Sequence, residues 1–390
     1  MKINAKRLLS LAVALVMILV MIPVSQLEVQ ADGEVDPEVA NAALDPTSTT
    51  CPTCDAENVE WKKLTGDVTV VEGETAHYYV EPGTTVGSGS DLKAISVSGG
   101  TLCLHLGNSN TKLYTTLRID STTGATVNLM GNKGQLRNKT TARPIVVKNN
   151  VTLNVYGGDI IGSSGGYRAD GGTIYVKGTS AESHAILNLY SGTVRAGKLT
   201  GSGNIGGNIY AEYADVNVIG CSIYNGSAED SGGNLAVVNG SLTMKGGQIY
   251  SGKVSTSAKS GGNIHLNNSQ MTMEGGKIYN GECTNAGGNI YLSGGASVTM
   301  SGGQIYGGKS TANAKYGGIF APAGTSVEIT GGYLAGHADD AEQNIIYTRV
   351  GGTISGATIG QIGENQLPGK VTVESGTLTL DDATVQGVDV

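Results

Sequence analysis

Residues 242–250 have the sequence LTMKGGQIY, and this stretch decides the fold because it recurs along the chain with a fixed internal spacing. In every copy the first apolar residue lies seven positions before the last one. Such a constant spacing indicates a tight turn at the Gly-Gly pair that accepts no insertion. The paired apolar positions are Leu153/Ile160, Leu187/Val194, Val216/Ile223, Leu242/Ile249, Met271/Ile278, Val298/Ile305 and Val327/Leu334.

A second motif, Gly-Gly-Asn-Ile or a close variant, follows each copy. Its apolar residue falls at Ile174, Ile209, Leu235, Ile264, Ile290, Ile319 and Ile345. After a first step of 35 residues, the spacing alternates between 26 and 29, which makes the true repeat 55 residues long. We infer that a unit of two coils has been duplicated.

Each repeat contains three short runs in which apolar and polar residues alternate, and none shows helical periodicity. Parallel strands need long connections, and a chain that winds through the other two faces of a coil supplies them. The sequence therefore predicts an all-β fold, a right-handed, single-stranded parallel β-helix (solenoid) of about 9–11 coils. We place it at residues 68–390, with the clearest repeats at 150–350.

The N-terminal residues are typical of an exported protein. Basic residues precede an apolar run that ends at Ile22, and Val29-Gln30-Ala31 resembles a cleavage site, so we expect a signal peptide at 1–31. A membrane anchor is the competing interpretation, but the apolar run is shorter than the ~20 residues a spanning helix needs. We expect a flexible spacer at 32–50, a small cap segment at 51–67 and no membrane-spanning segment after cleavage.

The composition argues against nucleic-acid binding. The full chain has a net charge of −8, and loss of residues 1–31 removes three of 25 basic and one of 33 acidic residues, giving −10. An acidic surface repels nucleic acid. We therefore expect no nucleic-acid partner. From the signal peptide we expect a secreted, extracellular protein, associated with a cell surface.

The five cysteines leave several interpretations open. Cys51 and Cys54 form a CxxC pair, which is compatible with half of a zinc site, a redox motif or a local disulfide. A zinc site of the common kind needs a second pair, whereas Cys103, Cys221 and Cys283 are isolated in sequence. The sequence thus offers Cys51 and Cys54 as metal ligands but predicts no complete metal site and no cofactor.

One polar position recurs with a structural explanation. Asn208, Asn234, Asn263 and Asn289 occupy equivalent positions in successive coils. We expect them to adopt the left-handed backbone conformation at a bend and to form a hydrogen-bonded ladder between coils.

On these Gly-Gly-x-Ile-Tyr and Gly-Gly-Asn-Ile repeats, residues 150–350 resemble secreted right-handed β-helix proteins of the pectate-lyase-like superfamily, especially adhesin-like surface proteins of gut Firmicutes. The resemblance implies the fold and a secreted bacterial protein. It leaves the activity open, because that superfamily includes lyases, hydrolases, epimerases, tailspikes and non-catalytic adhesins.

A catalytic site would need carboxylates on adjacent coils. Alignment of the repeats places Asp159 beside Thr193, Asp215 beside Ser241 and Glu328 beside Thr299, so no two carboxylates pair. The stretch 336–340 (GHADD) resembles a hydrolase fragment but lacks companion motifs. We therefore expect no enzyme and no catalytic residue; the alternative is a pectin-active polysaccharide lyase or glycoside hydrolase.

Two rows of side chains are candidate binding residues for an extracellular glycan or a host or cell-wall surface. Tyr224, Tyr250, Tyr279 and Tyr306 should form an outward aromatic row, which either stacks on sugar rings or stabilises the sheet by itself. Lys253 and Lys309 lie in the longer loops of alternate coils, where they either contact a ligand or are simply solvated. Because loop length varies only at this edge, we expect any ligand to bind there.

Overall fold

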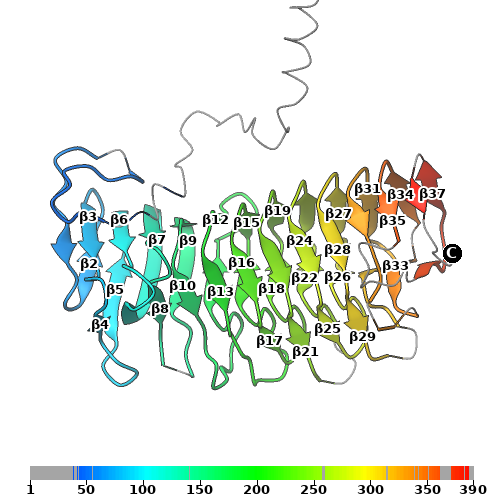
Figure 1. The fold of residues 1–390 in the computed structure, drawn as a ribbon, viewed down its shortest axis with the longest axis horizontal. Coiled ribbons are helices and arrows are strands. Elements are labelled where there is room, and N and C mark those ends of the chain that lie inside the picture. The colour runs from blue at the N-terminus through cyan, green and yellow to red at the C-terminus, as the bar shows by residue number, and fades with distance from the viewer. Residues whose placement is uncertain are drawn as a thin grey trace, which may run out of the picture. The chain divides into compact units, whose positions relative to one another are not determined.

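The described residues of this computed structural model form an all-β parallel solenoid of about 11 turns, as the sequence predicts (Figure 1). The described residues are 38, 42, 44–54, 56–139, 141–256, 260–312, 315–337, 339–340, 342–349, 351–360, 370–381 and 383–385. The predicted signal peptide and residues 32–37 lie outside them. Among the described residues, no helix has the length and apolar character that crossing a membrane would require.

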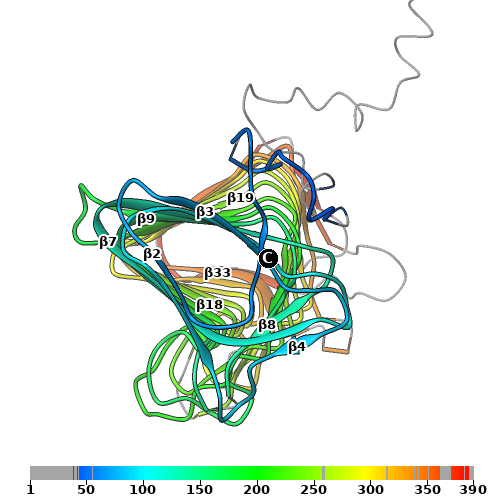
Figure 2. The same cartoon turned by 90° about the vertical axis from the view of Figure 1, so that its left-hand side faces the viewer.

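Each coil contributes one strand to each of three parallel ladders, and successive coils superimpose along the axis (Figure 2). The first ladder contains β2 (Val68–Val70), β5 (Lys93–Val97), β7 (Lys112–Met130), β9 (Ile145–Val155), β11 (Ile174–Lys177), β14 (Ile209–Glu212), β18 (Leu235–Val238), β22 (Ile264–Asn267), β26 (Ile290–Ser293), β30 (Ile319–Ala321), β33 (Asn344–Thr348) and β36 (Lys370–Val373).

The second ladder begins with a strand inside the predicted cap segment. It contains β1 (Lys62–Lys63), β3 (Thr75–Tyr79), β6 (Gly100–His105), the later parts of β7 and β9, β12 (Ala185–Leu189), β15 (Ala214–Val218), β19 (Ser241–Met244), β23 (Gln270–Met273), β27 (Ser297–Met300), β31 (Ser326–Ile329), β34 (Gly352–Ser355) and β37 (Leu378–Asp381).

The third ladder carries the Ile-Tyr motif. It contains β4 (Thr85–Val86), the start of β7, β8 (Gln135–Arg137), β10 (Asp159–Ile161), β13 (Thr193–Arg195), β16 (Ser222–Tyr224), β20 (Gln248–Tyr250), β24 (Lys277–Tyr279), β28 (Gln304–Tyr306), β32 (Tyr333–Leu334), β35 (Thr358–Ile359) and β38 (Thr384–Val385). A fourth, short ladder lies in the loops that follow the third ladder and contains β17 (Ser227–Ala228), β21 (Lys253–Val254), β25 (Glu282–Cys283) and β29 (Lys309–Ser310).

The register confirms the predicted buried column of the first ladder. Ile209, Leu235, Ile264, Ile290 and Ile319 pair in series, and all are buried. The prediction for the next residue of this column is wrong by one position. Ile319 pairs with Ile346 instead of the predicted Ile345, because a bulge follows Asn344. Both isoleucines are buried, so the bulge adds a residue without exposing apolar surface.

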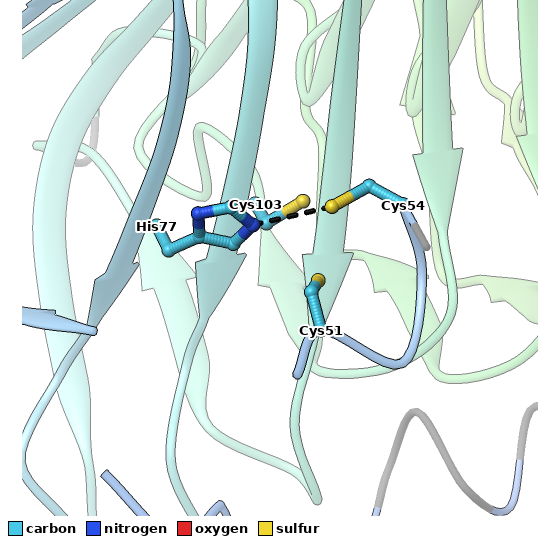
Figure 3. A group of neighbouring side chains, drawn as sticks. All are labelled: Cys51, Cys54, His77 and Cys103. Carbon is cyan, nitrogen blue, oxygen red and sulfur yellow. Dashed lines mark hydrogen bonds between the residues drawn. The ribbon is translucent and has the colours of Figure 1, made fainter. Parts of the chain in front are cut away.

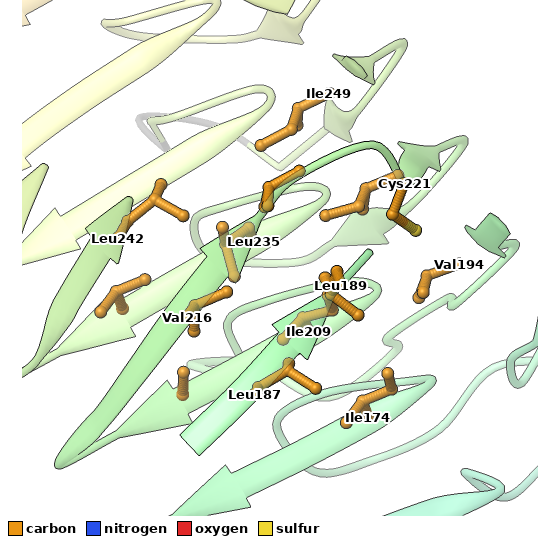
Figure 4. Packing of buried hydrophobic residues seen from close by; sticks show 14 of the residues in the cluster. Ile174, Leu187, Leu189, Val194, Ile209, Val216, Cys221, Leu235, Leu242 and Ile249 are labelled. Carbon is orange, nitrogen blue, oxygen red and sulfur yellow. The ribbon is translucent and has the colours of Figure 1, made fainter. Parts of the chain in front are cut away.

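The interior is a continuous aliphatic core to which all three ladders contribute (Figure 4). In β19, Leu242 and Met244 are fully buried while Thr243 between them is partly exposed, as the alternation of a strand requires.

The turn between the second and third ladders explains the invariant seven-residue spacing. Gly247 has φ 69°, and a Cβ at this position would lie 2.3 Å from the carbonyl oxygen of Cys221 on the preceding coil. A larger residue would therefore be strained and would also collide with backbone.

Candidate functional site

The four predicted ladder asparagines are buried and hydrogen-bonded in series. The Nδ2 to Oδ1 distances are 2.8 Å from Asn208 to Asn234, 2.9 Å from Asn234 to Asn263 and 2.9 Å from Asn263 to Asn289. Each of these amides also donates to the carbonyl oxygen of the tyrosine that ends the third-ladder strand, as Asn263 does to Tyr279 at 2.9 Å.

The prediction that these asparagines are left-handed is wrong. The left-handed residue lies two positions earlier, as at Gly261 (φ 71°), and a second one follows the Ile-Tyr motif, as at Asn280 (φ 54°). The asparagine side chains therefore fasten the bend by hydrogen bonds, while neighbouring residues supply its unusual backbone angles.

The predicted tyrosine row is a parallel stack. Ring centroids are 5.0 Å apart from Tyr224 to Tyr250, 4.8 Å from Tyr250 to Tyr279 and 5.0 Å from Tyr279 to Tyr306, with interplanar angles of 7°, 3° and 9°. Both faces of Tyr250 and Tyr279 are consequently covered by neighbouring rings. A sugar ring can stack only on the end rings, so the inner tyrosines serve the sheet.

At the Tyr224 end, the stack meets a pocket of about 610 Å³. The pocket is lined by turns that precede strands of the third ladder and by partly buried residues of four of these strands, β8, β10, β13 and β16. Its polar side chains come from Ser109, Asn132, Lys133, Gln135, Asp159, Ser191, Thr193 and Arg195. Four glycines, Gly131, Gly157, Gly158 and Gly192, give its wall a bare backbone.

An ion pair lines this pocket. Arg195 donates to both carboxylate oxygens of Asp159, from Nε at 2.7 Å and from a terminal nitrogen at 2.6 Å, and Thr193 Oγ1 adds a bond at 2.6 Å. Arg195 is also the ladder neighbour of Tyr224. Burial raises the pKa of the Tyr224 hydroxyl, and the nearby Arg195 charge opposes that rise.

The two candidate lysines lie on the fourth ladder, separate from the tyrosine stack. Lys253 and Lys309 flank Glu282 in adjacent strands, and Lys253 Nζ lies 3.2 Å from Glu282 Oε1. The charge of Lys253 is therefore partly neutralised. The loops that carry them include residues 257–259 and 313–314, which lie outside the described residues.

In the described ladders, the aligned partners of carboxylates are as predicted: Asp159 pairs with Thr193, Asp215 with Ser241 and Glu328 with Thr299. In the 336–340 stretch, Asp340 is bound to Lys315 at 2.9 Å and to Gln343 at 3.0 Å. These bonds fix the position of the Asp340 carboxylate.

Asp170 and Asp230, which lie in loops, and Glu212 at the end of β14 form an acidic group that alignment of strands did not reveal. Burial raises the pKa of Asp170. A hydrogen bond from Ile205 N and the charge of Arg143 oppose that rise, whereas the charges of Glu212 and Asp230 add to it. Glu212 accepts a bond from the Tyr210 hydroxyl at 3.0 Å and pairs with Lys177 at 2.8 Å.

The CxxC pair meets two further ligand-type side chains (Figure 3). His77 comes from β3 and Cys103 from β6, and these residues are direct ladder partners. The ligand atoms of Cys51, Cys54, His77 and Cys103 all lie within 4.8 Å of one another, and Cys54 Sγ is 3.2 Å from His77 Nε2.

The sequence contained a signal for this cluster that the search for a second CxxC pair missed. His77, Cys103 and Asn128 are 26 and 25 residues apart, close to the coil length of the later repeats, and occupy the outward face of the second ladder. Hydrogen bonds with the Cys103 and Cys54 thiols lower the pKa of Cys51, and the contact with Cys51 raises the pKa of Cys103. The hydrogen bonds of the cluster thus stabilise the thiolate form of Cys51.

No protein-family description matches the sequence, and comparison with curated proteins and with solved structures finds no match.

Proposed function

We propose that this chain is a secreted, non-catalytic interaction protein that binds extracellular glycans, related to the adhesin-like β-helix proteins of the pectate-lyase-like superfamily. The binding site is the pocket at the Tyr224 end of the tyrosine stack. The observation that supports it best is that Tyr224, at the end of this aromatic stack, and the Asp159–Arg195 pair line the same pocket.

The chemistry of the pocket suits a sugar. Carboxylate, guanidinium, amide and hydroxyl groups offer both donors and acceptors to sugar hydroxyls, and Tyr224 offers an aromatic surface. The Asp159–Arg195 pair fixes both side chains before a ligand arrives, which lowers the entropic cost of binding. The solenoid supplies a rigid support for these groups.

A glycan array with the purified chain tests this proposal. We expect binding to a defined class of glycan, weakened at least about tenfold in Tyr224→Leu and in Asp159→Asn. Tyr279→Leu is the matched control: it removes a ring from the same stack two coils away, and it should retain binding. Equal affinity in Tyr224→Leu and wild type would place the site elsewhere, and binding lost only in a Lys253→Ala/Lys309→Ala double variant would move it to the fourth ladder.

The second candidate is a polysaccharide lyase or hydrolase, favoured by the carboxyl of Asp170. A raised pKa is what a general acid needs, and Glu212 and Asp230 provide further carboxylates. Assays for new reducing ends and for unsaturated products on the glycans that bind would decide between the two. Turnover that disappears in Asp170→Asn would establish the enzyme, whereas binding without turnover supports the interaction protein.

A further inference from the structure

We propose that Cys51, Cys54, His77 and Cys103 bind one Zn²⁺ ion, which fastens the N-terminal segment onto the first coils of the β-helix. This site is independent of the pocket at Tyr224. It joins two ligands from the CxxC turn to one from each of two neighbouring strands, β3 and β6.

The ligand set and its geometry fit zinc. Three thiolates and one imidazole are a common set for structural zinc, which binds four ligands tetrahedrally with Zn–S near 2.3 Å. Tetrahedral geometry at that bond length puts sulfurs roughly 3.8 Å apart. The four ligand atoms already lie within 4.8 Å of one another, so small side-chain rotations complete the site.

The surroundings of the sulfurs fit a structural metal site. Cys51, His77 and Cys103 are buried, and two donors reach Cys103 Sγ: Asn128 Nδ2 at 3.5 Å and Thr53 Oγ1 at 3.6 Å. Hydrogen bonds to thiolate sulfurs orient zinc ligands and stabilise their negative charge.

A disulfide explains the cluster less well. Any pairing among Cys51, Cys54 and Cys103 leaves one thiol and the imidazole of His77 without a role, whereas a metal ion uses all four groups. The remaining cysteines cannot complete a second pair with the cluster, because Cys221 and Cys283 are buried in other coils.

The site would add a metal link to the contacts that already hold the CxxC turn against the second ladder. Residues around the CxxC turn form a small hairpin, with Thr50 opposite Glu57, and Asn128 Nδ2 donates to Thr53 O at 3.1 Å. Zinc would link this hairpin to two strands of the second ladder. Since metal bound only by the folded state stabilises it, the ion should protect the N-terminal coils from opening.

The test measures metal content on the full chain, purified under reducing conditions and loaded with Zn²⁺. We expect one zinc per chain by elemental analysis, and intense d–d bands of a tetrahedral thiolate complex after loading with Co²⁺. Trp61, the only tryptophan, lies with its ring centroid 5.2 Å from that of His77, so its fluorescence should respond to metal addition.

Variants separate this site from other thiols. Cys54→Ser and His77→Ala should each lower the zinc content at least about tenfold at a chelator concentration that wild type withstands. Cys54 is only partly buried, so Cys54→Ser should keep the β-sheet circular dichroism spectrum of wild type. Cys283→Ala, a buried cysteine outside the cluster, should keep one zinc. Zinc content unchanged in Cys54→Ser, a loaded chain that holds iron or copper but no zinc, or a chain whose mass shows a disulfide in the cluster and no metal binding would each overturn the proposal.

Discussion

The side-chain amide of Asn128 donates a hydrogen bond to the sulfur of Cys103, with Nδ2 and Sγ 3.5 Å apart. The same asparagine accepts a bond from Asn154 at 2.8 Å, and Asn154 accepts one from Asn188 at 2.8 Å. A row of asparagines on the outward face of the second ladder therefore ends at the cysteine cluster. The row polarises its amides in one direction, toward the sulfur.

The first prediction concerns this contact. Asn128→Ala should weaken zinc binding about 10- to 100-fold, because the Cys103 sulfur loses a donor and Thr53 loses its bond to the ladder. Chelator competition measures the effect. Asn188→Ala is the control: it removes bonds from the same row but lies two coils from Asn128, and its zinc affinity should equal that of wild type. Equal affinities in both variants would show that the sulfur contact has no role.

The second prediction concerns the row of buried, hydrogen-bonded asparagines at the bend that precedes the strands of the first ladder. Asn263→Ala should destabilise the fold by about 2–4 kcal/mol, because the side chain makes four hydrogen bonds in a buried site. Asn263→Gly should cost at least as much as Ala, since the residue has no positive φ that glycine would relieve and glycine adds backbone entropy to the unfolded chain. Chemical denaturation of both variants measures this order, and a milder effect of glycine would restore the left-handed interpretation.

The fold could be predicted from the repeat because the alternation of apolar residues and the Gly-Gly turn each have a single structural explanation. Alternation fixed the inward residues, such as Leu242 and Met244, and the Gly-Gly turn fixed the seven-residue spacing through a close backbone approach at Gly247. The bulge after Asn344 escaped prediction because Ile345 and Ile346 are both apolar, so either residue satisfies the pattern.

The metal-type cluster was hidden for a different reason. The early coils contain long strands, β7 and β9, that pass through two or three ladders without a Gly-Gly turn, so the repeat motif is absent there. His77 and Cys103 become neighbours only once the coil length is extended into this region. The predicted row of binding tyrosines was only partly useful for a similar reason. The sequence places one tyrosine in each coil, but it does not reveal that neighbouring rings stack and cover each other's faces.

The third prediction concerns alkaline pH. Burial raises the pKa of Tyr279 to about 12 from an ordinary value of 10, so the folded state favours the protonated hydroxyl. Its contribution to stability is complete below pH 10 and is lost as the pH rises toward 12. Tyr279→Phe keeps the ring but cannot ionise, so its stability should fall less steeply over this range. Because the Tyr279 side chain is only partly buried, solvent screens its charge and the difference should be only about 1 kcal/mol. Urea denaturation at neutral and alkaline pH measures it, and parallel pH profiles would contradict the assignment.

The last prediction concerns acidic pH and His265, which lies in β22 on the outward side of the first ladder. Burial lowers its pKa to about 4 from 6.5, and the charge of Asp230 only partly opposes this. Its Nε2 lies 2.9 Å from Ser293 Oγ, while Nδ1 has no partner among the described residues. The unfolded chain therefore takes up a proton at higher pH than the folded chain, so stability should fall as the pH drops from 6.5 to 4. The loss should reach at most about 3 kcal/mol.

His265→Tyr removes the titrating group and matches the tyrosine at the next position of the column, Tyr291. Urea denaturation across this range should show a smaller loss of stability for the variant. An identical loss in both proteins would mean that the pKa of His265 is the same in the folded and unfolded states.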